Sequence, residues 1–381
     1  MNPTGYYING KSLTNLSLGC MRFPSVESAI ETISAGVESG VVYLDTSPAY
    51  LYRSEEENCE TWVGKGIKGY REQVILTAKS AVGGWGQESG YNPAKGYSIT
   101  TADQVYKQIE QSLTRLQTNY LDCYHLWAVH TSDTFDMALK PGGWIEGALK
   151  AKDDGLFISL GITGHAGSEE IIRWINSELF DVITIPFNIL DNSRIPAIKH
   201  AYEKSIPVLA MNPLAGGLLA SSSSVLSSEL DELGVESAYD MALRYCTSFP
   251  GVSALSGMTS KDEVNENVRV INKPSWTELQ AESVRETLFS LLGSSQYICT
   301  TCKYCLPCPQ GIWIPEVLKL RNYFSVLKMD SARKLYLSRS KNDDRFRAQN
   351  CVKCGACESR CPNGLPVGKL MQEVSEVFYG N

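Results

Sequence analysis

The chain has 381 residues, which exceeds one average domain and predicts one large domain plus a smaller one. Its composition, 43% hydrophobic and 20% charged, is typical of a soluble globular protein, and no apolar run approaches the ~18 residues needed to cross a bilayer. The first residues lack a basic stretch followed by an apolar run. We therefore expect no secretory signal, a cytoplasmic location and no membrane partner.

Charge and cysteine are both unevenly distributed. Residues 295–381 carry 13 Lys and Arg against 7 Asp and Glu (+6), which leaves 22 against 35 (−13) for the rest of a chain of net charge −7. Eight of the 12 cysteines fall in the same C-terminal region. In a chain that is not secreted, clustered cysteines are typical of metal ligands rather than disulfides. The basic residues form no stripe interleaved with aromatic residues, so we expect no nucleic-acid partner.

The first ~272 residues alternate short apolar runs with amphipathic stretches. The runs are rich in β-branched residues, as expected for strands buried on both faces. They span residues 13–19, 41–45, 74–78, 121–127, 156–162, 182–187, 206–211 and 252–255. Between them, residues 27–38 and 101–116 have apolar side chains at helical spacing, and Thr101 is suited to cap the second helix.

Eight strand–helix pairs in about 260 residues predict an α/β fold, with a (β/α)8 TIM barrel over residues 1–272. The alternative is a doubly wound open sheet, against which weighs the lack of a Gly-x-Gly-x-x-Gly opening the first helix. Residues 273–294 are expected to form a linking helix, and residues 295–381 a small helix-rich, ferredoxin-like domain with a helix over 316–327. Residues 80–99 and 218–228, after the third and seventh strands, are expected to be long loops.

The C-terminal cysteines form two runs of four. The second run has the bacterial ferredoxin spacing, and the first is one residue shorter before its last cysteine. Three thiolates two residues apart can hold three corners of a 4Fe–4S cube, while the fourth ligates the other cube. We therefore predict two 4Fe–4S clusters, one on Cys299, Cys302, Cys305 and Cys361, the other on Cys351, Cys354, Cys357 and Cys308. Zinc is the alternative, but four-cysteine zinc sites usually draw on two spaced pairs.

Four polar residues fall where a barrel places its chemistry. Asp45 ends the second strand, Tyr50 follows in the loop, Lys79 ends the third strand and His125 lies near the end of the fourth. A tyrosine hydroxyl can donate a proton to a carbonyl oxygen, and a nearby Lys79 should lower the pKa of Tyr50 from about 10. Asp45 would hold Lys79, and His125 would orient the carbonyl or assist proton transfer. One buried His or Lys is usually structural, but four such residues at successive strand ends favour a catalytic interpretation.

Several motifs resemble those of the aldo/keto reductases. They are Leu18-Gly19-Cys20-Met21-Arg22, Leu44-Asp45-Thr46-Ser47-x2-Tyr50, Thr77-Ala78-Lys79, Asp122-x2-His125, Gly161-Ile162-Thr163-Gly164-His165, Asn212-Pro213-Leu214-x-Gly216-Gly217 and Glu266-Asn267. With the cysteine-rich tail, the chain resembles the subgroup that fuses this barrel to a ferredoxin-like 4Fe–4S domain. The resemblance implies carbonyl–alcohol redox chemistry, with Tyr50 as the general acid.

The same resemblance implies a cofactor site from which this sequence partly departs. The expected contacts fall at Thr163, Gly164, His165, Thr184, Met211, Asn212, Gly257, Met258, Thr259 and Asn267. Thr163-Gly164 replaces the Ser-Asn pair that grips a nicotinamide amide, and Met211 replaces the stacking aromatic residue. Glu263 falls where a basic residue clamps the 2′-phosphate and should repel it, although the turn at 257–260 could cradle a phosphate with its N–H groups. NAD(P)H and a flavin therefore both stay open.

Three functions remain open. The first is an oxidoreductase that acts on a small carbonyl or alcohol, with electrons relayed by the clusters and supplied by a carrier resembling a ferredoxin or flavodoxin. The second is an NAD(P)H-dependent reductase with structural clusters. The third is a non-enzymatic electron-transfer or redox-sensing protein, against which the complete set of four barrel residues argues.

Overall fold

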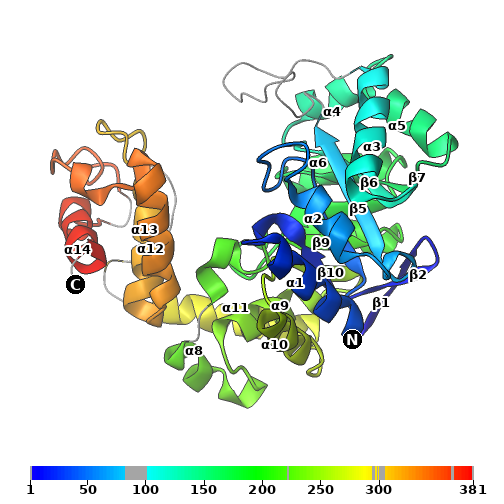
Figure 1. Cartoon of the computed structure of the whole chain (residues 1–381). Coiled ribbons are helices and arrows are strands. Elements are labelled where there is room, and N and C mark those ends of the chain that lie inside the picture. Colours follow the sequence, from blue (N-terminus) through cyan, green and yellow to red (C-terminus); the bar gives the residue numbers. More distant parts are fainter. Residues whose placement is uncertain are drawn as a thin grey trace. The chain divides into compact units, whose positions relative to one another are not determined.

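The computed structural model describes residues 2–81, 101–220, 223–293, 297, 299, 305–361 and 364–379. The chain divides into two compact units. The first comprises Met1–Pro213 and Leu243–Thr277, and the second comprises Leu214–Ala242 and Glu278–Asn381. Each unit is coloured along the sequence in Figure 1.

Eight parallel strands close the first unit into a barrel (Figure 1). They are β3 Leu16–Gly19, β4 Tyr43–Asp45, β5 Ile75–Ala81, β6 Leu121–Trp127, β7 Phe157–Thr163, β8 Val182–Pro186, β9 Val208–Met211 and β10 Val252–Ser256. Each overlaps one predicted apolar run, and β10 pairs with β3 to complete the ring. The (β/α)8 prediction is therefore confirmed, and the open-sheet alternative is wrong.

Amphipathic helices follow the strands. They are α1 Val26–Glu38, α2 Cys59–Gly66, α3 Ala102–Leu116, α4 Ser132–Leu139, α5 Trp144–Asp153, α6 Ser168–Asn176, α7 Ile195–Glu203, α9 Ala238–Thr247 and α10 Lys261–Ile271. Thr101 caps α3 as predicted, because its side chain accepts from Gln104 N while the Gln104 side chain accepts from Thr101 N. The predicted loop at 80–99 lies outside the described residues from 82 onward.

A short hairpin, which the sequence analysis did not predict, precedes the barrel. Strands β1 Pro3–Ile8 and β2 Lys11–Thr14 pair in antiparallel fashion. Ile8 and Leu13 from this hairpin join a buried cluster inside the barrel, with Tyr43, Ile75, Cys123, Val182 and Leu209. Since most of these partners lie near the N-terminal ends of their strands, the hairpin plugs that end of the barrel. The predicted run at 13–19 is thus divided between β2 and β3.

One buried carboxylate ties the hairpin to the barrel wall. Oδ1 of Asp122, on β6, accepts hydrogen bonds from Asn9 Nδ2 at 2.8 Å and from Lys11 Nζ at 2.5 Å. Its Oδ2 accepts from Arg71 Nη1 at 2.8 Å and from the Leu76 backbone N–H at 3.0 Å. A buried charge is tolerated when it is both paired and hydrogen-bonded, and Asp122 meets both conditions.

The second unit is helical in its described residues. Its α-helices are α8 Ser224–Glu229, α11 Glu278–Gly293, α12 Ile314–Leu327, α13 Asp330–Asn342 and α14 Val367–Tyr379. Phe378 of α14 packs edge-on against Tyr336 and Phe324, with ring centroids 4.9 and 5.1 Å away. The predicted helix at 316–327 lies within α12.

The segment after β9 belongs to this second unit. Ser223 caps α8 by accepting from Leu226 N, so the expectation of a loop over 218–228 is wrong for most of its length. The same Ser223 hydroxyl donates to Leu327 O at 2.6 Å, at the end of α12. Ser331 of α13 donates to Leu218 O, also at 2.6 Å. A segment that enters from the barrel therefore packs on the helices that flank the cysteines.

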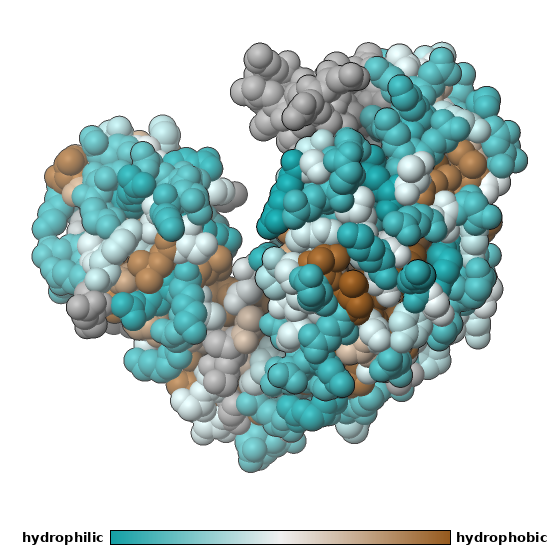
Figure 2. All heavy atoms as spheres, viewed as in Figure 1, coloured by the Kyte–Doolittle hydropathy of each residue, from teal (hydrophilic) through white to brown (hydrophobic). Residues whose placement is uncertain are grey.

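Most residues on the face of the molecule in Figure 2 are hydrophilic, and its apolar patches are small. Among the described residues, no helix is both long and apolar enough to cross a membrane.

We expect Asp122→Ala to destabilise the barrel by about 3 kcal/mol, because it leaves the charges of Lys11 and Arg71 without their buried partner. Chemical denaturation followed by circular dichroism measures the loss. Asp154→Ala is the matched control, because Asp154 pairs with Lys150 on the surface and its removal should not shift the transition. Equal shifts for the two variants would contradict the role given to Asp122.

Candidate active site and cluster site

A buried ion pair lies at the C-terminal end of the barrel. Asp45 ends β4 and Lys79 lies in the neighbouring strand β5, and both side chains are buried. Lys79 Nζ donates a hydrogen bond to Asp45 Oδ1. Parallel strands place their carboxyl ends together, so residues 34 positions apart meet at one rim, as the sequence predicted.

Tyr50 joins this pair from the turn after β4. The centroid of its half-buried ring lies 5.4 Å from Lys79 Nζ, within the range of a cation–π contact. Trp127, at the end of β6, meets the same ring edge-on, with the centroids 6.2 Å apart. Lys79 therefore contacts two of the other three predicted barrel residues, Asp45 and Tyr50.

The expected lowering of the Tyr50 pKa is wrong. Burial raises the pKa of Tyr50 well above 10, and Asp45, Cys59 and Cys20 add to the effect. The physical reason is that Asp45 binds the ammonium group of Lys79, while burial disfavours a phenolate. At neutral pH the Tyr50 hydroxyl is therefore protonated, which is the state that a proton donor needs.

His125 pairs with Lys79 in the register of β5 and β6, but its imidazole is bound inside the barrel. Its Nε2 lies 2.8 Å from Tyr43 Oη and 3.4 Å from Cys123 Sγ. Burial, and after it the charge of Lys79, lowers the pKa of His125 well below its ordinary 6.5. The ring is consequently neutral.

The predicted cofactor residues lie at the same end of the barrel. The end of β7 and the residues after it contain Thr163, Gly164 and His165, and β8 contains Thr184. The end of β9 contains Met211 and Asn212. The turn after β10 contains Gly257, Met258 and Thr259, and α10 contains Asn267. Gly164 is sterically required, since a Cβ there would come within 1.4 Å of Val129 O. Asn267 Nδ2 donates to Ser256 Oγ at 2.8 Å, and His165 N donates to His130 Nδ1 at 3.1 Å.

The turn that could cradle a phosphate is filled by the chain itself. Glu263 Oε2 accepts from Thr259 N at 2.6 Å and from Thr259 Oγ1 at 3.0 Å. Ser260 caps α10 by accepting from Glu263 N at 3.3 Å. The two donors of Thr259 are therefore already bound to a carboxylate, whose charge at this helix N-terminus disfavours a 2′-phosphate.

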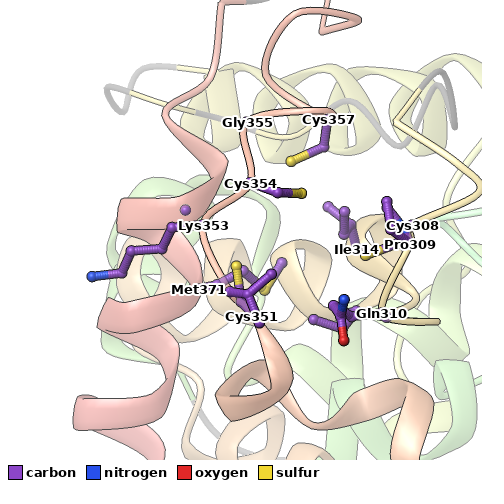
Figure 3. A pocket seen from close by; sticks show the side chains of 13 residues that line it. Cys308, Pro309, Gln310, Ile314, Cys351, Lys353, Cys354, Gly355, Cys357 and Met371 are labelled. Atoms are coloured by element: carbon purple, nitrogen blue, oxygen red, sulfur yellow. The ribbon is translucent and has the colours of Figure 1, made fainter.

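Four cysteines line one pocket in the second unit (Figure 3). Cys351, Cys354 and Cys357 come from the second run, and Cys308 comes from the end of the first. Gly355, at φ +75°, allows the chain to turn between Cys354 and Cys357. The rest of the lining is largely apolar and contains no carboxylate: Pro309, Gln310, Ile312, Ile314, Val352, Lys353, Gly355, Gly368 and Met371.

This donor set fits a thiolate-bound cluster. Burial above all, with Glu358, Cys351 and Cys308 nearby, raises the pKa of Cys357 to about 11. Bound iron would have to displace that proton, so metal affinity should rise with pH. Four thiols from two stretches of chain match the donor set of a 4Fe–4S cluster.

The other predicted quartet is only partly described. Cys302 lies outside the described residues, Cys305 is buried, and Cys299 and Cys361 are half-buried. Next to Cys361, Arg360 donates to the carbonyl oxygens of Leu306 and Pro307 at 3.3 and 3.2 Å. The two runs are therefore joined by hydrogen bonds, while the ligation of the first cluster stays a prediction.

Comparison with known proteins agrees with this architecture. The sequence profile of the aldo/keto reductase family matches residues 15–288. The chain belongs to the aldo/keto reductase family. A 4Fe-4S dicluster domain matches residues 298–366, so this aldo/keto reductase also carries an iron–sulfur domain.

Individual relatives match part of the chain. The uncharacterized oxidoreductase YqkF of Bacillus subtilis is 27% identical over 300 residues, which cover 72% of this aldo/keto reductase and 92% of YqkF. An NADH-specific methylglyoxal reductase of Escherichia coli is 23% identical over 64% of this chain and 82% of its own. The solved structure of aldo-keto reductase AKR11C1 from Bacillus halodurans, holo form, superposes with a TM-score of 0.59, at 24% identity over 73% of this chain and 93% of that one.

The sequence interpretation missed Tyr43 and Arg360. Tyr43 lies two residues before Asp45 on the same strand, so strand alternation already places both side chains on the inner face. Arg360 had no comparable signal, because its partners are backbone carbonyls of the first cysteine run.

Because Cys308 lines the pocket of the second run, Cys308→Ala should lose about half of the bound iron and disrupt the cluster held by Cys351, Cys354 and Cys357. Iron and acid-labile sulfide assays on oxygen-free protein measure the loss. Cys246→Ala is the control, since Cys246 is buried in the barrel unit. Full iron content in Cys308→Ala would contradict the proposed exchange of ligands between the runs.

Proposed function

We propose that this aldo/keto reductase interconverts a small carbonyl compound and its alcohol at the barrel, with electrons relayed by two 4Fe–4S clusters. The observation that carries the proposal is the Asp45–Lys79 ion pair against the ring of Tyr50. The pocket lined by four cysteines supports the redox part. Together they give one chain both a proton donor and a place for electron carriers.

The barrel residues would deliver the proton. Reduction of a carbonyl to an alcohol takes up two electrons and two protons. A dinucleotide or flavin reduced by the clusters would bring both electrons and one proton to the carbon as a hydride, and Tyr50 supplies the proton that reaches the oxygen. As that proton leaves, the positive charge of Lys79 stabilises the phenolate that remains. Asp45 holds the ammonium group of Lys79 in place through a buried ion pair.

When bound, 4Fe–4S clusters supply electrons one at a time, so two of them match the two electrons of the reaction. Cys354 is exposed, and the neighbouring Val352 is 61% exposed. An exposed apolar side chain beside a redox site, with Lys353 next to it, suits the docking of a small acidic electron carrier such as a ferredoxin or flavodoxin. The basic surplus of this region favours the same partner.

A dinucleotide or flavin in the barrel would convert between one-electron and two-electron steps. A related barrel, an aldo/keto reductase of Klebsiella pneumoniae, was solved in complex with NADP and acetate, and it superposes here with a TM-score of 0.57 at 18% identity. The side chain of Glu263 favours a cofactor without a 2′-phosphate.

The second candidate function is an NAD(P)H-dependent reductase whose clusters only brace the second unit. The observation in its favour is that Arg360 and the cysteines join two stretches of chain in a small helical unit, which a cluster could staple. The name of the Escherichia coli relative, an NADH-specific reductase, points the same way.

An anaerobic experiment separates the two functions. Clusters reduced by a low-potential donor are mixed with small aldehydes and ketones and with oxidised NAD or a flavin, and no NADH or NADPH is supplied. We expect reoxidation of the clusters and formation of the alcohol, with two cluster electrons consumed per carbonyl. Turnover only with NADH or NADPH, with the cluster spectrum unchanged, would support the second function instead.

Tyr50→Phe should lower the rate of carbonyl reduction about 10²- to 10⁴-fold, because the ring remains while the proton donor is lost. Tyr52→Phe is the matched control, since Tyr52 lies in the same turn with its hydroxyl on Glu55. Because the pKa of Tyr50 is raised, the wild-type rate should be independent of this group from pH 7 to about 10 and fall only above it. A rate that falls with a midpoint below pH 9 would contradict a protonated Tyr50 as the donor.

Glu263→Lys should increase the affinity for NADPH about tenfold relative to NADH, because it removes the carboxylate from Thr259 and adds a cation at the helix N-terminus. Fluorescence titration with NADPH and with NADH measures the two dissociation constants and hence their ratio. Glu31→Lys makes the same charge change on the exposed face of α1 and serves as the control. An unchanged ratio of NADPH to NADH affinity in Glu263→Lys would show that this turn does not contact the 2′-phosphate.

A further inference from the structure

We propose that Tyr43 is the positioning residue for His125: its phenol oxygen holds Nε2 inside the barrel and fixes the tautomer and direction of the imidazole. The expected effect of Tyr43 on catalysis rests on the proposed function, whereas its contact with His125 does not. It assigns a role to a residue that lies below the three residues at the rim and outside every motif of the sequence.

The geometry of the inner face supports this pairing. Tyr43 and Asp45 alternate on β4, and Cys123 and His125 alternate on β6, so all four side chains point into the barrel. Tyr43 and His125 are fully buried, and Tyr43 Oη lies 2.8 Å from His125 Nε2. Cys123 Sγ, at 3.4 Å, is a weak second partner for the same nitrogen.

The other ring nitrogen indicates where the proton lies. Nδ1 of His125 is buried without a hydrogen-bond partner, and it faces Gly161, where a Cβ would come within 2.3 Å of it. A buried N–H without an acceptor is rarer than an unfilled acceptor lone pair. The proton of the neutral ring is therefore on Nε2, and Nε2–H donates to Tyr43 Oη.

Tyr43 keeps its own proton at neutral pH, because burial raises the pKa of its hydroxyl well above 10.

This arrangement has a consequence for proton delivery. Because the Nε2–H of His125 is bound to Tyr43, we expect Tyr50 rather than His125 to donate the proton to the substrate. A neutral imidazole next to Lys79 also leaves the ammonium group free to act on Asp45 and Tyr50. Tyr43 thus fixes the tautomer and orientation of His125 without contacting the substrate.

Nitrogen-15 NMR of histidine tests the inference on the intact, oxidised protein with its clusters bound. The chain has only four histidines, so the ring signals can be resolved. In the wild type we expect one ring with a slowly exchanging proton on Nε2 and none on Nδ1. In Tyr43→Phe that protected Nε2–H signal should be lost to exchange. Tyr124→Phe is the matched control, because Tyr124 is an equally buried barrel tyrosine whose hydroxyl donates to Ser80 Oγ at 2.7 Å.

Two results would overturn the inference: no wild-type ring with a protected Nε2–H, or a Tyr43→Phe protein that keeps this signal unchanged. If Tyr43→Phe does not fold, the wild-type spectrum decides alone. Kinetics then test the link to function: kcat for carbonyl reduction should fall about tenfold in Tyr43→Phe with KM changed less than about twofold, and neither should change in Tyr124→Phe. If the wild type reduces no carbonyl, the proposed function is wrong. The NMR spectrum still tests the contact between Tyr43 and His125 independently.

Discussion

The ion pair between Asp45 and Lys79 is the constraint around which the barrel rim is organised. Two charges this deeply buried are stable only as partners, so β4 and β5 must align closely enough to bring residues 34 positions apart into contact. The ring of Tyr50 lies over the ammonium group, and His125 stays neutral beside it. The proton-donating phenol, its supporting cation and its buried neighbours therefore all depend on one pairing of strands.

At the opposite end of the barrel, Asp122 plays an analogous role for the fold. It receives four hydrogen bonds from the hairpin, the barrel wall and the segment before β5. The two buried carboxylates thus lie at opposite ends of the barrel. Asp45 binds the lysine of the proposed active site, and Asp122 binds the hairpin at the other end. The apolar layer that contains Tyr43 and Cys123 lies between them and separates the two charged networks.

The strands and the cysteine spacing could be predicted because they depend on local patterns. Apolar runs located all eight barrel strands, and the two runs of four cysteines predicted the pairing of Cys308 with the second run, which the lining of the pocket now supports. The hairpin was missed because its strands are short and mostly polar on one face. The raised pKa of Tyr50, the carboxylate of Glu263 at Thr259 and the partner of His125 depend on burial and on contacts distant in sequence, which no periodicity encodes.

The segment Leu214–Ala242 gives the molecule an interleaved connectivity. The chain passes from the barrel unit to the helical unit after Pro213, returns at Leu243 and leaves again after Thr277. A protein cut after residue 277 would retain Leu214–Ala242 but lose α12 and α13, whose Leu327 and Ser331 bind Ser223 and Leu218. Removal of the iron–sulfur region would therefore leave Leu214–Ala242 without these partners, because the backbone crosses between the two units three times.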